Sequence, residues 1–71
     1  MSKKELDFAV FCIENIAEFF NRNGADVYRM LDESGILDGY IIKSYDVLHT
    51  LGKEYIVSDI ADYMEEAGLE L

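Results

Sequence analysis

The segment SKKELDFAVFCIENIAEFFNRNG, from Ser2 to Gly24, decides the fold class of this chain. Ser2 followed three residues later by Glu5 is a capping-box pattern, which is typical of a helix start. We expect Gly24 to end this helix, because glycine is favoured just past a helix C-terminus. Apolar residues recur at spacings of three and four, which predicts an amphipathic helix over residues 3–22. Its expected inward face consists of Leu6, Ala9, Val10, Ile13, Ile16, Ala17 and Phe20.

The rest of the chain continues this helical pattern and is interrupted by glycine, with no proline at all. Gly35, Gly52 and Gly68 each follow a helical stretch and are expected to end it, and Ser44 is expected to cap a helix start. We therefore predict an all-α fold, a small bundle of four to five helices over about residues 3–22, 25–34, 37–42, 44–51 and 53–67. One alternative remains open, in which the β-prone triplets 40–42 and 55–57 pair as a short ribbon.

Length and charge restrict the partners of the protein. With 71 residues, we expect a single helical domain over residues 1–71. Hydrophobic residues make up 51% of the chain, which argues against disorder and is more than one small core easily buries. The net charge is −9, and the six Lys and Arg residues are scattered, so nucleic acid and anionic membranes are not expected partners. We expect a protein partner, either a basic protein or a second copy of the chain in a homodimer.

The residues that could carry catalysis are few. Cys12, Asp46 and His49 are the only ingredients for a nucleophilic triad, and Cys12 lies on the apolar side of the first helix. A thiol in such a place behaves as a small hydrophobe, so the sequence predicts no enzyme. One Cys and one His cannot form a structural zinc site, and no cofactor motif is present, so we expect no metal and no cofactor. The single Cys, with no signal peptide or membrane span, favours a cytoplasmic protein.

Two surface features are candidate contact sites for a partner. Phe11 falls among polar residues of the first helix, where it could anchor a partner; it could equally be a singly exposed aromatic or be covered by a later segment. The outer face of the last helix is acidic, which suits either a solvated face or docking of a basic partner. The candidate interface comprises Phe8, Phe11, Asn15 and Phe19 on the first helix and Tyr55, Asp59 and Asp62 on the last.

A helix-turn-helix transcriptional regulator is the alternative function. The helix over residues 25–34, the turn at 35–37 and a helix from about Asp38 have suitable lengths for this motif. The second helix would present Lys43 alongside Asp38 and Asp46, which is poor chemistry for approaching phosphates. The charge therefore disfavours this alternative.

One run of sequence carries a family resemblance. Together with Ile36-Leu37-Asp38-Gly39-Tyr40-Ile41-Ile42, the run Tyr45-Asp46-Val47-Leu48-His49-Thr50-Leu51-Gly52-Lys53-Glu54-Tyr55-Ile56-Val57 resembles a family of short bacterial proteins classed as a domain of unknown function. The resemblance implies a bacterial origin and a stand-alone small domain. It also implies genes neighbouring ADP-ribosyltransferase-like proteins, which would suit an antitoxin or accessory role.

The same resemblance draws attention to Tyr45, Asp46, His49 and Thr50 as a recognition run, in which Asp46 and His49 would make the polar contacts. A structural interpretation remains open beside it. A His in the last turn before Gly52 can cap carbonyl groups and interact favourably with the negative end of a helix.

Overall fold

The computed structural model describes residues 1–69, and all regular secondary structure in that range is helical. In chain order these are α1 (Lys3–Phe20), α2 (Gly24–Glu33), the π-helix η1 (Leu37–Ile42), α3 (Tyr45–Leu48) and α4 (Lys53–Glu66). The predicted all-α class is confirmed. The alternative ribbon is wrong, because residues 40–42 lie in η1 and residues 55–57 lie in α4.

The start of α1 is the predicted capping box, but its end differs from the prediction. The Ser2 N–H donates to Glu5 Oε1 at 2.8 Å, and the Glu5 N–H donates to Ser2 Oγ at 3.2 Å. At the other end the helix closes at Asn21, whose φ of 55° is left-handed. Asparagine tolerates that conformation better than most residues, so Gly24 is not needed as a stop.

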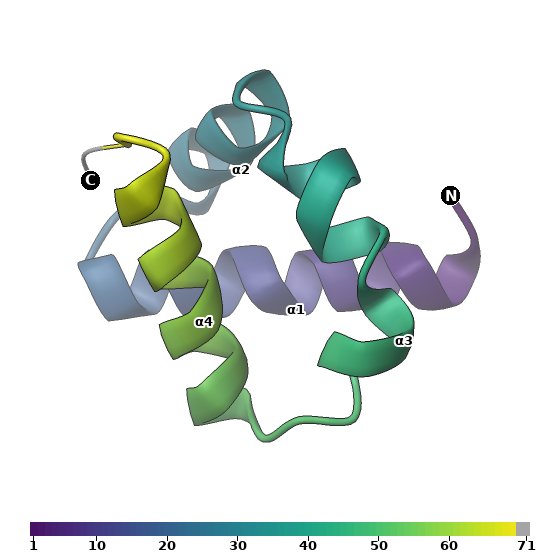
Figure 1. Cartoon of the computed structure of the whole chain (residues 1–71). Helices are drawn as coiled ribbons and strands as arrows, with labels where there is room; N and C mark the ends of the chain where they lie inside the picture. Colours follow the sequence, from purple (N-terminus) through teal and green to yellow (C-terminus); the bar gives the residue numbers. More distant parts are fainter. Residues whose placement is uncertain (70–71) are drawn as a thin grey trace.

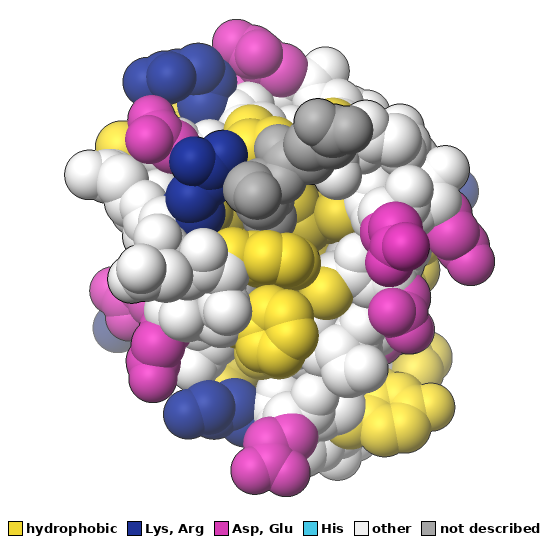
Figure 2. Space-filling model, turned by 90° about the vertical axis from the view of Figure 1, so that its left-hand side faces the viewer, with side chains coloured by type: hydrophobic (Ala, Val, Ile, Leu, Met, Phe, Trp, Pro, Cys, Tyr) yellow, Lys and Arg dark blue, Asp and Glu magenta, His cyan; other side chains and the backbone are white. Residues whose placement is uncertain are grey.

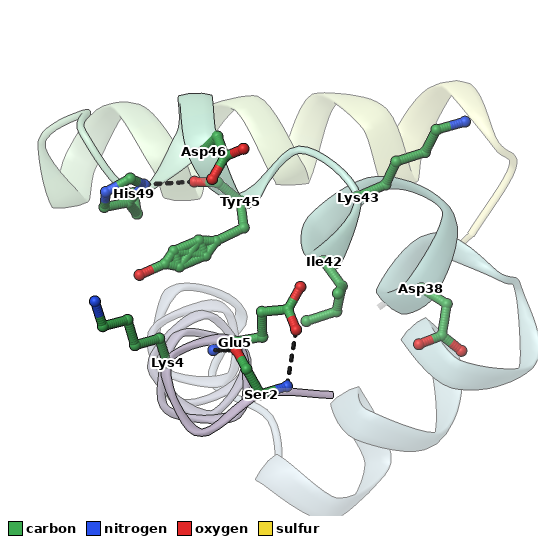
Figure 3. Close-up of a pocket in the computed structure, with 9 residues that line it drawn as sticks. All are labelled: Ser2, Lys4, Glu5, Asp38, Ile42, Lys43, Tyr45, Asp46 and His49. Carbon is green, nitrogen blue, oxygen red and sulfur yellow. Dashed lines mark hydrogen bonds between the residues drawn. The ribbon is translucent and has the colours of Figure 1, made fainter.

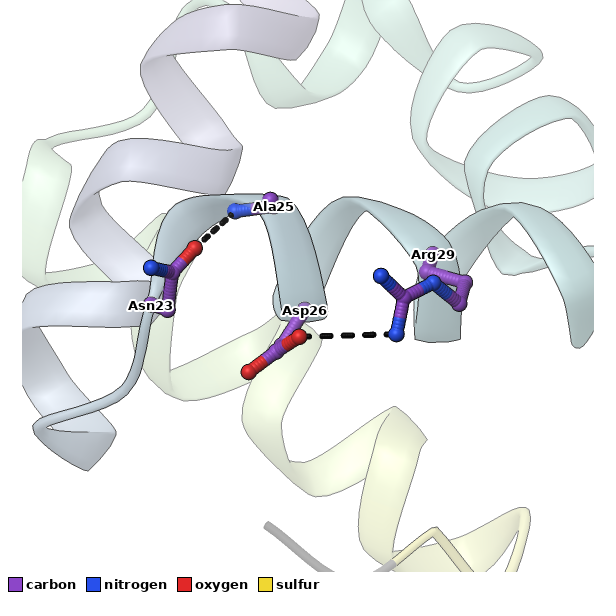
Figure 4. Close-up of polar contacts among 4 residues, drawn as sticks. All are labelled: Asn23, Ala25, Asp26 and Arg29. Carbon is purple, nitrogen blue, oxygen red and sulfur yellow. Dashed lines mark hydrogen bonds and ion pairs between the residues drawn. The ribbon is translucent and has the colours of Figure 1, made fainter.

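Gly24 is instead the first residue of α2, and the cap before it is Asn23. The Asn23 side chain accepts a hydrogen bond from the Ala25 N–H at 2.7 Å (Figure 4). One turn later, Asp26 pairs with Arg29 at 3.5 Å on the exposed side of α2 (Figure 4). Two asparagines therefore set the boundary between the first two helices, where a glycine was expected to do so.

The other expected stops divide into two kinds. Gly35 and Gly68 follow helices with φ values of 82° and 80°, so their prediction is confirmed. Gly52 has an extended backbone and is the residue before α4, so it starts a helix where it was expected to end one. The segment predicted as a helix over 44–51 is a single turn, and the Ser44 side chain makes no capping hydrogen bond.

The face that α1 buries is also rotated from the prediction. Leu6 and Val10 are exposed, whereas Phe8 and Cys12 are buried. The helix is apolar around much of its circumference, so its own periodicity does not settle which stripe faces the core. The neighbouring helices decide this, because α2, η1 and α4 all pack against α1.

Around α1 the remaining helices form one shared core. Figure 1 shows α1 crossing the molecule, with α4 near its C-terminal end and α3 near its N-terminal end. The radius of gyration is 10.9 Å, close to the value of about 11 Å expected for a compact chain of this length. Over the described residues, none of the helices combines the length and apolarity that a bilayer crossing requires. The core consists of Phe8, Ala9, Cys12, Ile16, Ala17, Val27, Leu31, Ile36, Leu37, Ile41, Leu48, Ile56, Val57, Ile60 and Met64.

Candidate functional site

The aromatic residues predicted as one contact surface on α1 lie in three different environments. Phe8 is 9% exposed and belongs to the core, so it offers a partner little surface, and its role in an interface stays a prediction. Phe11 is 36% exposed, and its ring stacks on Phe8 with centroids 6.2 Å apart. Phe19 is 61% exposed and meets Phe20 edge-on with centroids 4.9 Å apart. Because Phe11 and Phe19 are eight residues apart, they lie about 12 Å apart along the helix axis and do not form one patch.

Phe19 separates two hollows in the surface between α1 and α4. The first has a volume of about 310 Å³ and the second about 250 Å³, and Phe19 lines both. We call this surface, with both hollows and Phe19 between them, the α1–α4 groove. The first hollow is lined by Phe19, Phe20, Ser58, Ala61, Asp62, Met64, Glu65 and Leu69, and the second by Asn15, Glu18, Phe19, Lys53, Glu54 and Val57.

Three of the predicted interface residues therefore meet in the groove, namely Asn15, Phe19 and Asp62. Tyr55 is exposed on α4 but lines neither hollow. Residues that the sequence reasoning missed complete the surface, above all the small side chains of Ser58 and Ala61. These two small residues, three apart on α4, were the available sequence signal that α4 leaves space against α1.

The groove combines an apolar floor with an acidic rim. Figure 2 shows the side of the molecule on which α4 and the C-terminal end of α1 lie, where hydrophobic side chains gather in the middle and both acidic and basic side chains surround them. The lining residues themselves are unbalanced in charge, since four are acidic and one is basic. These are Glu18, Glu54, Asp62 and Glu65 against Lys53.

Asp59, predicted to belong to an acidic docking strip, has a structural role instead. Its carboxylate accepts a hydrogen bond from the Tyr40 hydroxyl, which ties η1 to α4. The Tyr40 ring also stacks on Tyr63, with centroids 4.2 Å apart. Partial burial, together with the Asp59 carboxylate, raises the pKa of Tyr40 to about 12. Asp59 is therefore engaged within the fold, and its contact with a partner stays a prediction.

The recognition run makes mostly internal contacts. Tyr45 packs against Phe8 at a centroid distance of 5.4 Å and against His49 at 4.3 Å. His49 Nδ1 lies 2.6 Å from the Tyr45 carbonyl oxygen, which can only accept, so this nitrogen carries the hydrogen. The Thr50 hydroxyl donates to the Val47 carbonyl at 2.7 Å. These bonds support the structural interpretation of His49 as a cap.

A third hollow, of about 590 Å³, lies beside this run (Figure 3). It is lined by Ser2, Lys4, Glu5, Asp38, Ile42, Lys43, Tyr45, Asp46 and His49. Figure 3 shows that Glu5 turns its carboxylate toward the Ser2 backbone, so this acid is occupied by the capping box. The backbone hydrogen bond from Ser2 is the main reason that the pKa of Glu5 lies below its usual 4.5. The hollow mixes both signs of charge and shows no pairing of a nucleophile with a base.

The only thiol of the chain lies outside all three hollows. Cys12 is completely buried, and burial raises its pKa to about 12, so it is protonated at neutral pH. The predicted triad ingredients are thus not assembled, since His49 bonds a backbone carbonyl at the surface. Among residues 1–69, no group of three His, Cys, Asp or Glu side chains is arranged to hold a metal ion.

The helix-turn-helix alternative meets a geometric difficulty. The segment expected to read DNA is divided into the six-residue η1 and the four-residue α3, with Lys43 and Ser44 between them. A recognition helix has to present several side chains along one continuous face in the major groove.

Comparison with known proteins gives one match. A family model described as a protein of unknown function (DUF3791) matches residues 7–67. No curated protein and no solved structure matched the chain. The matched range takes in the recognition run and the α1–α4 groove except Leu69, and the description of the family names no activity from which residue roles could be transferred.

Proposed function

The chain belongs to the DUF3791 family of proteins of unknown function, and from this premise we propose that it is a protein-interaction module that binds a partner through the α1–α4 groove. The observation that carries the proposal is Phe19, which stays 61% exposed between two hollows. A large aromatic at the centre of an apolar surface with a polar rim is the usual anatomy of a protein interface.

A binding role fits the chemistry of the described residues better than a catalytic one. The thiol of Cys12 is buried and protonated, and His49 is engaged with the backbone of its own helix. The hollows of the groove are lined mainly by apolar and acidic side chains, and no hydrogen bond joins a nucleophile to a base among the lining residues. An accessory or antitoxin-like protein is one form that such a module would take.

The experiment compares three tagged baits in cells of the native host. They are the wild type, Phe19→Asp, and Val47→Asp as a control. Val47 is a matched control because it is 66% exposed and lies on α3, away from the groove. We expect a partner that the wild type and the Val47 variant recover equally and that Phe19→Asp recovers at least tenfold less, because a charge would replace the apolar anchor.

Sedimentation of the same three proteins completes the test. A wild type that dimerises while Phe19→Asp stays monomeric would support the groove as an interface between two copies. Equal recovery by all three baits, together with identical sedimentation, would overturn the proposal. Circular dichroism checks that the variants keep their helices, which we expect because neither side chain is buried.

A further inference from the structure

The charge of the groove discriminates between its potential occupants. A second copy of this chain would bring the same surface, with Glu18, Glu54, Asp62 and Glu65, against an identical set. Each copy also carries a net charge of −9, so approach of two such faces is opposed by repulsion. A partner rich in Lys and Arg meets no such penalty and would be attracted over a distance.

The spacing of the two hollows indicates the shape of the occupant. On α4 the second hollow is formed around residues 53–57 and the first around residues 58–65. Their centres are therefore separated by roughly seven residues, or about 11 Å along α4. A helix lying alongside α4 presents side chains at this separation from positions i and i+7, on one face and two turns apart.

The position of Phe19 supports the same geometry. It is 61% exposed and lines both hollows, so an occupant that fills both hollows has to accommodate its ring. A helix with small or polar residues between its two anchors leaves room for this ring, whereas a continuous flat surface does not. The acids are also divided between the hollows, with Glu18 and Glu54 at one and Asp62 and Glu65 at the other.

We propose that the α1–α4 groove binds a basic amphipathic helix of a partner protein, which places apolar side chains at positions i and i+7 into the two hollows on either side of Phe19. The proposal rests on the proposed function and adds the class of partner to it. Lys and Arg residues flanking the two anchors would pair with the acids at both ends of the groove.

The test uses three synthetic helical peptides of equal length as probes, the first two of which have the same composition. The first carries Leu at i and i+7 with Lys on both flanks. The second has the two Leu at i and i+5, which lie on different faces of a helix. The third keeps the first register but replaces Lys by Glu. We expect the full-length protein to bind the first peptide at least tenfold more tightly than either of the others, with affinity falling as salt is raised.

Protein variants locate the binding. Phe19→Ser is expected to lower the affinity for the first peptide at least tenfold. Asp62→Asn combined with Glu65→Gln is expected to lower this affinity severalfold and to reduce its dependence on salt. Asp32→Asn serves as the matched control, since Asp32 is an exposed acid on α2 outside both hollows. It should leave binding unchanged.

Each outcome has a distinct consequence. This inference would be overturned if the first and second peptides bound equally well, or if Phe19→Ser left the affinity for the first peptide unchanged. A Phe19-dependent homodimer, or a Phe19-dependent partner that is acidic or not helical, would also overturn it while leaving the interaction function intact. If the protein showed no preference for the first peptide, and if Phe19→Asp recovered as much partner as the wild type, both proposals would be wrong. The rim variants keep the test decisive if Phe19→Ser does not fold.

Discussion

Cys12 offers a direct measure of how the native fold opens. It is completely buried, and its thiol is protonated in the folded state because its pKa is about 12. An alkylating reagent such as iodoacetamide reacts with the thiolate, so it has to wait until the chain unfolds. The labelling rate of the native protein then equals the rate of the unfolded chain multiplied by the unfolding equilibrium constant.

The expected size of this protection follows from the chain length. For 71 residues, a stability of roughly 0.05–0.15 kcal/mol per residue corresponds to about 4–11 kcal/mol. Native Cys12 should accordingly react about 10³ to 10⁸ times more slowly than in urea, at the same pH. Replacing the buried Ile60 by Val removes one methylene, which costs about 0.5–1.5 kcal/mol. Labelling should therefore become about two- to twelvefold faster in the Ile60→Val protein.

The assay follows iodoacetamide labelling by mass spectrometry at pH 8 in wild type, Ile60→Val and Val47→Ala. The last is the control, because Val47 is exposed and its truncation should change stability by no more than about 0.5 kcal/mol. Wild-type labelling within tenfold of the rate in urea would refute the burial argument and reopen a catalytic role for the thiol. An Ile60→Val protein with a lower urea midpoint but unchanged labelling would show that Cys12 becomes accessible through a local opening.

Three further predictions concern single groups. The pKa of Cys12 is higher in the folded state than its ordinary 9.0, so the unfolded chain loses this proton first as the pH rises. The free energy of unfolding should therefore fall by about 1 kcal/mol between pH 9 and 10. Urea titrations of Cys12→Ala should show a smaller fall. Ser2→Ala should raise the pKa of Glu5 only part of the way toward 4.5, because it removes the Ser2 hydroxyl, the second cause of the lowering, and keeps the Ser2 N–H, the first. An unchanged carboxyl titration by NMR would contradict this. Tyr40→Phe removes the hydroxyl that donates to Asp59 and should lower the free energy of unfolding by about 0.5–1.5 kcal/mol in urea titrations. An equal loss in an Asp59→Ala background, where no acceptor is left, would show that the two groups do not interact.

Local chemistry was the part of the fold that could be read from the sequence. The Ser2–Glu5 capping box and the left-handed glycines at 35 and 68 act within one turn of the chain, so short-range patterns are sufficient to find them. The helical class follows from periodicity over longer windows. The prediction that His49 caps its own turn belongs with these, because its partner is a carbonyl four residues earlier.

Helix boundaries near glycine and asparagine were harder to predict. Gly24 and Gly52 resemble helix stops by position, but each lies at the start of the next helix. Asn21 performs the left-handed turn that was assigned to Gly24, since asparagine accepts positive φ at modest cost. Several residues in the same short segment can serve either role, so local propensity does not choose between them.

The candidate site depended on contacts between helices distant in sequence. Composition and periodicity alone indicated an acidic helical chain with excess apolar surface and no assembled active site. Only the packing of the helices on one another decided that Phe8 is buried against Tyr45, that Asp59 of α4 bonds Tyr40 of η1, and that Phe19 stays exposed beside two hollows. A helix that is apolar on most sides has no single inward face of its own. The neighbouring helices cover some of its aromatic residues and leave others exposed for a partner, and only the tertiary structure shows which.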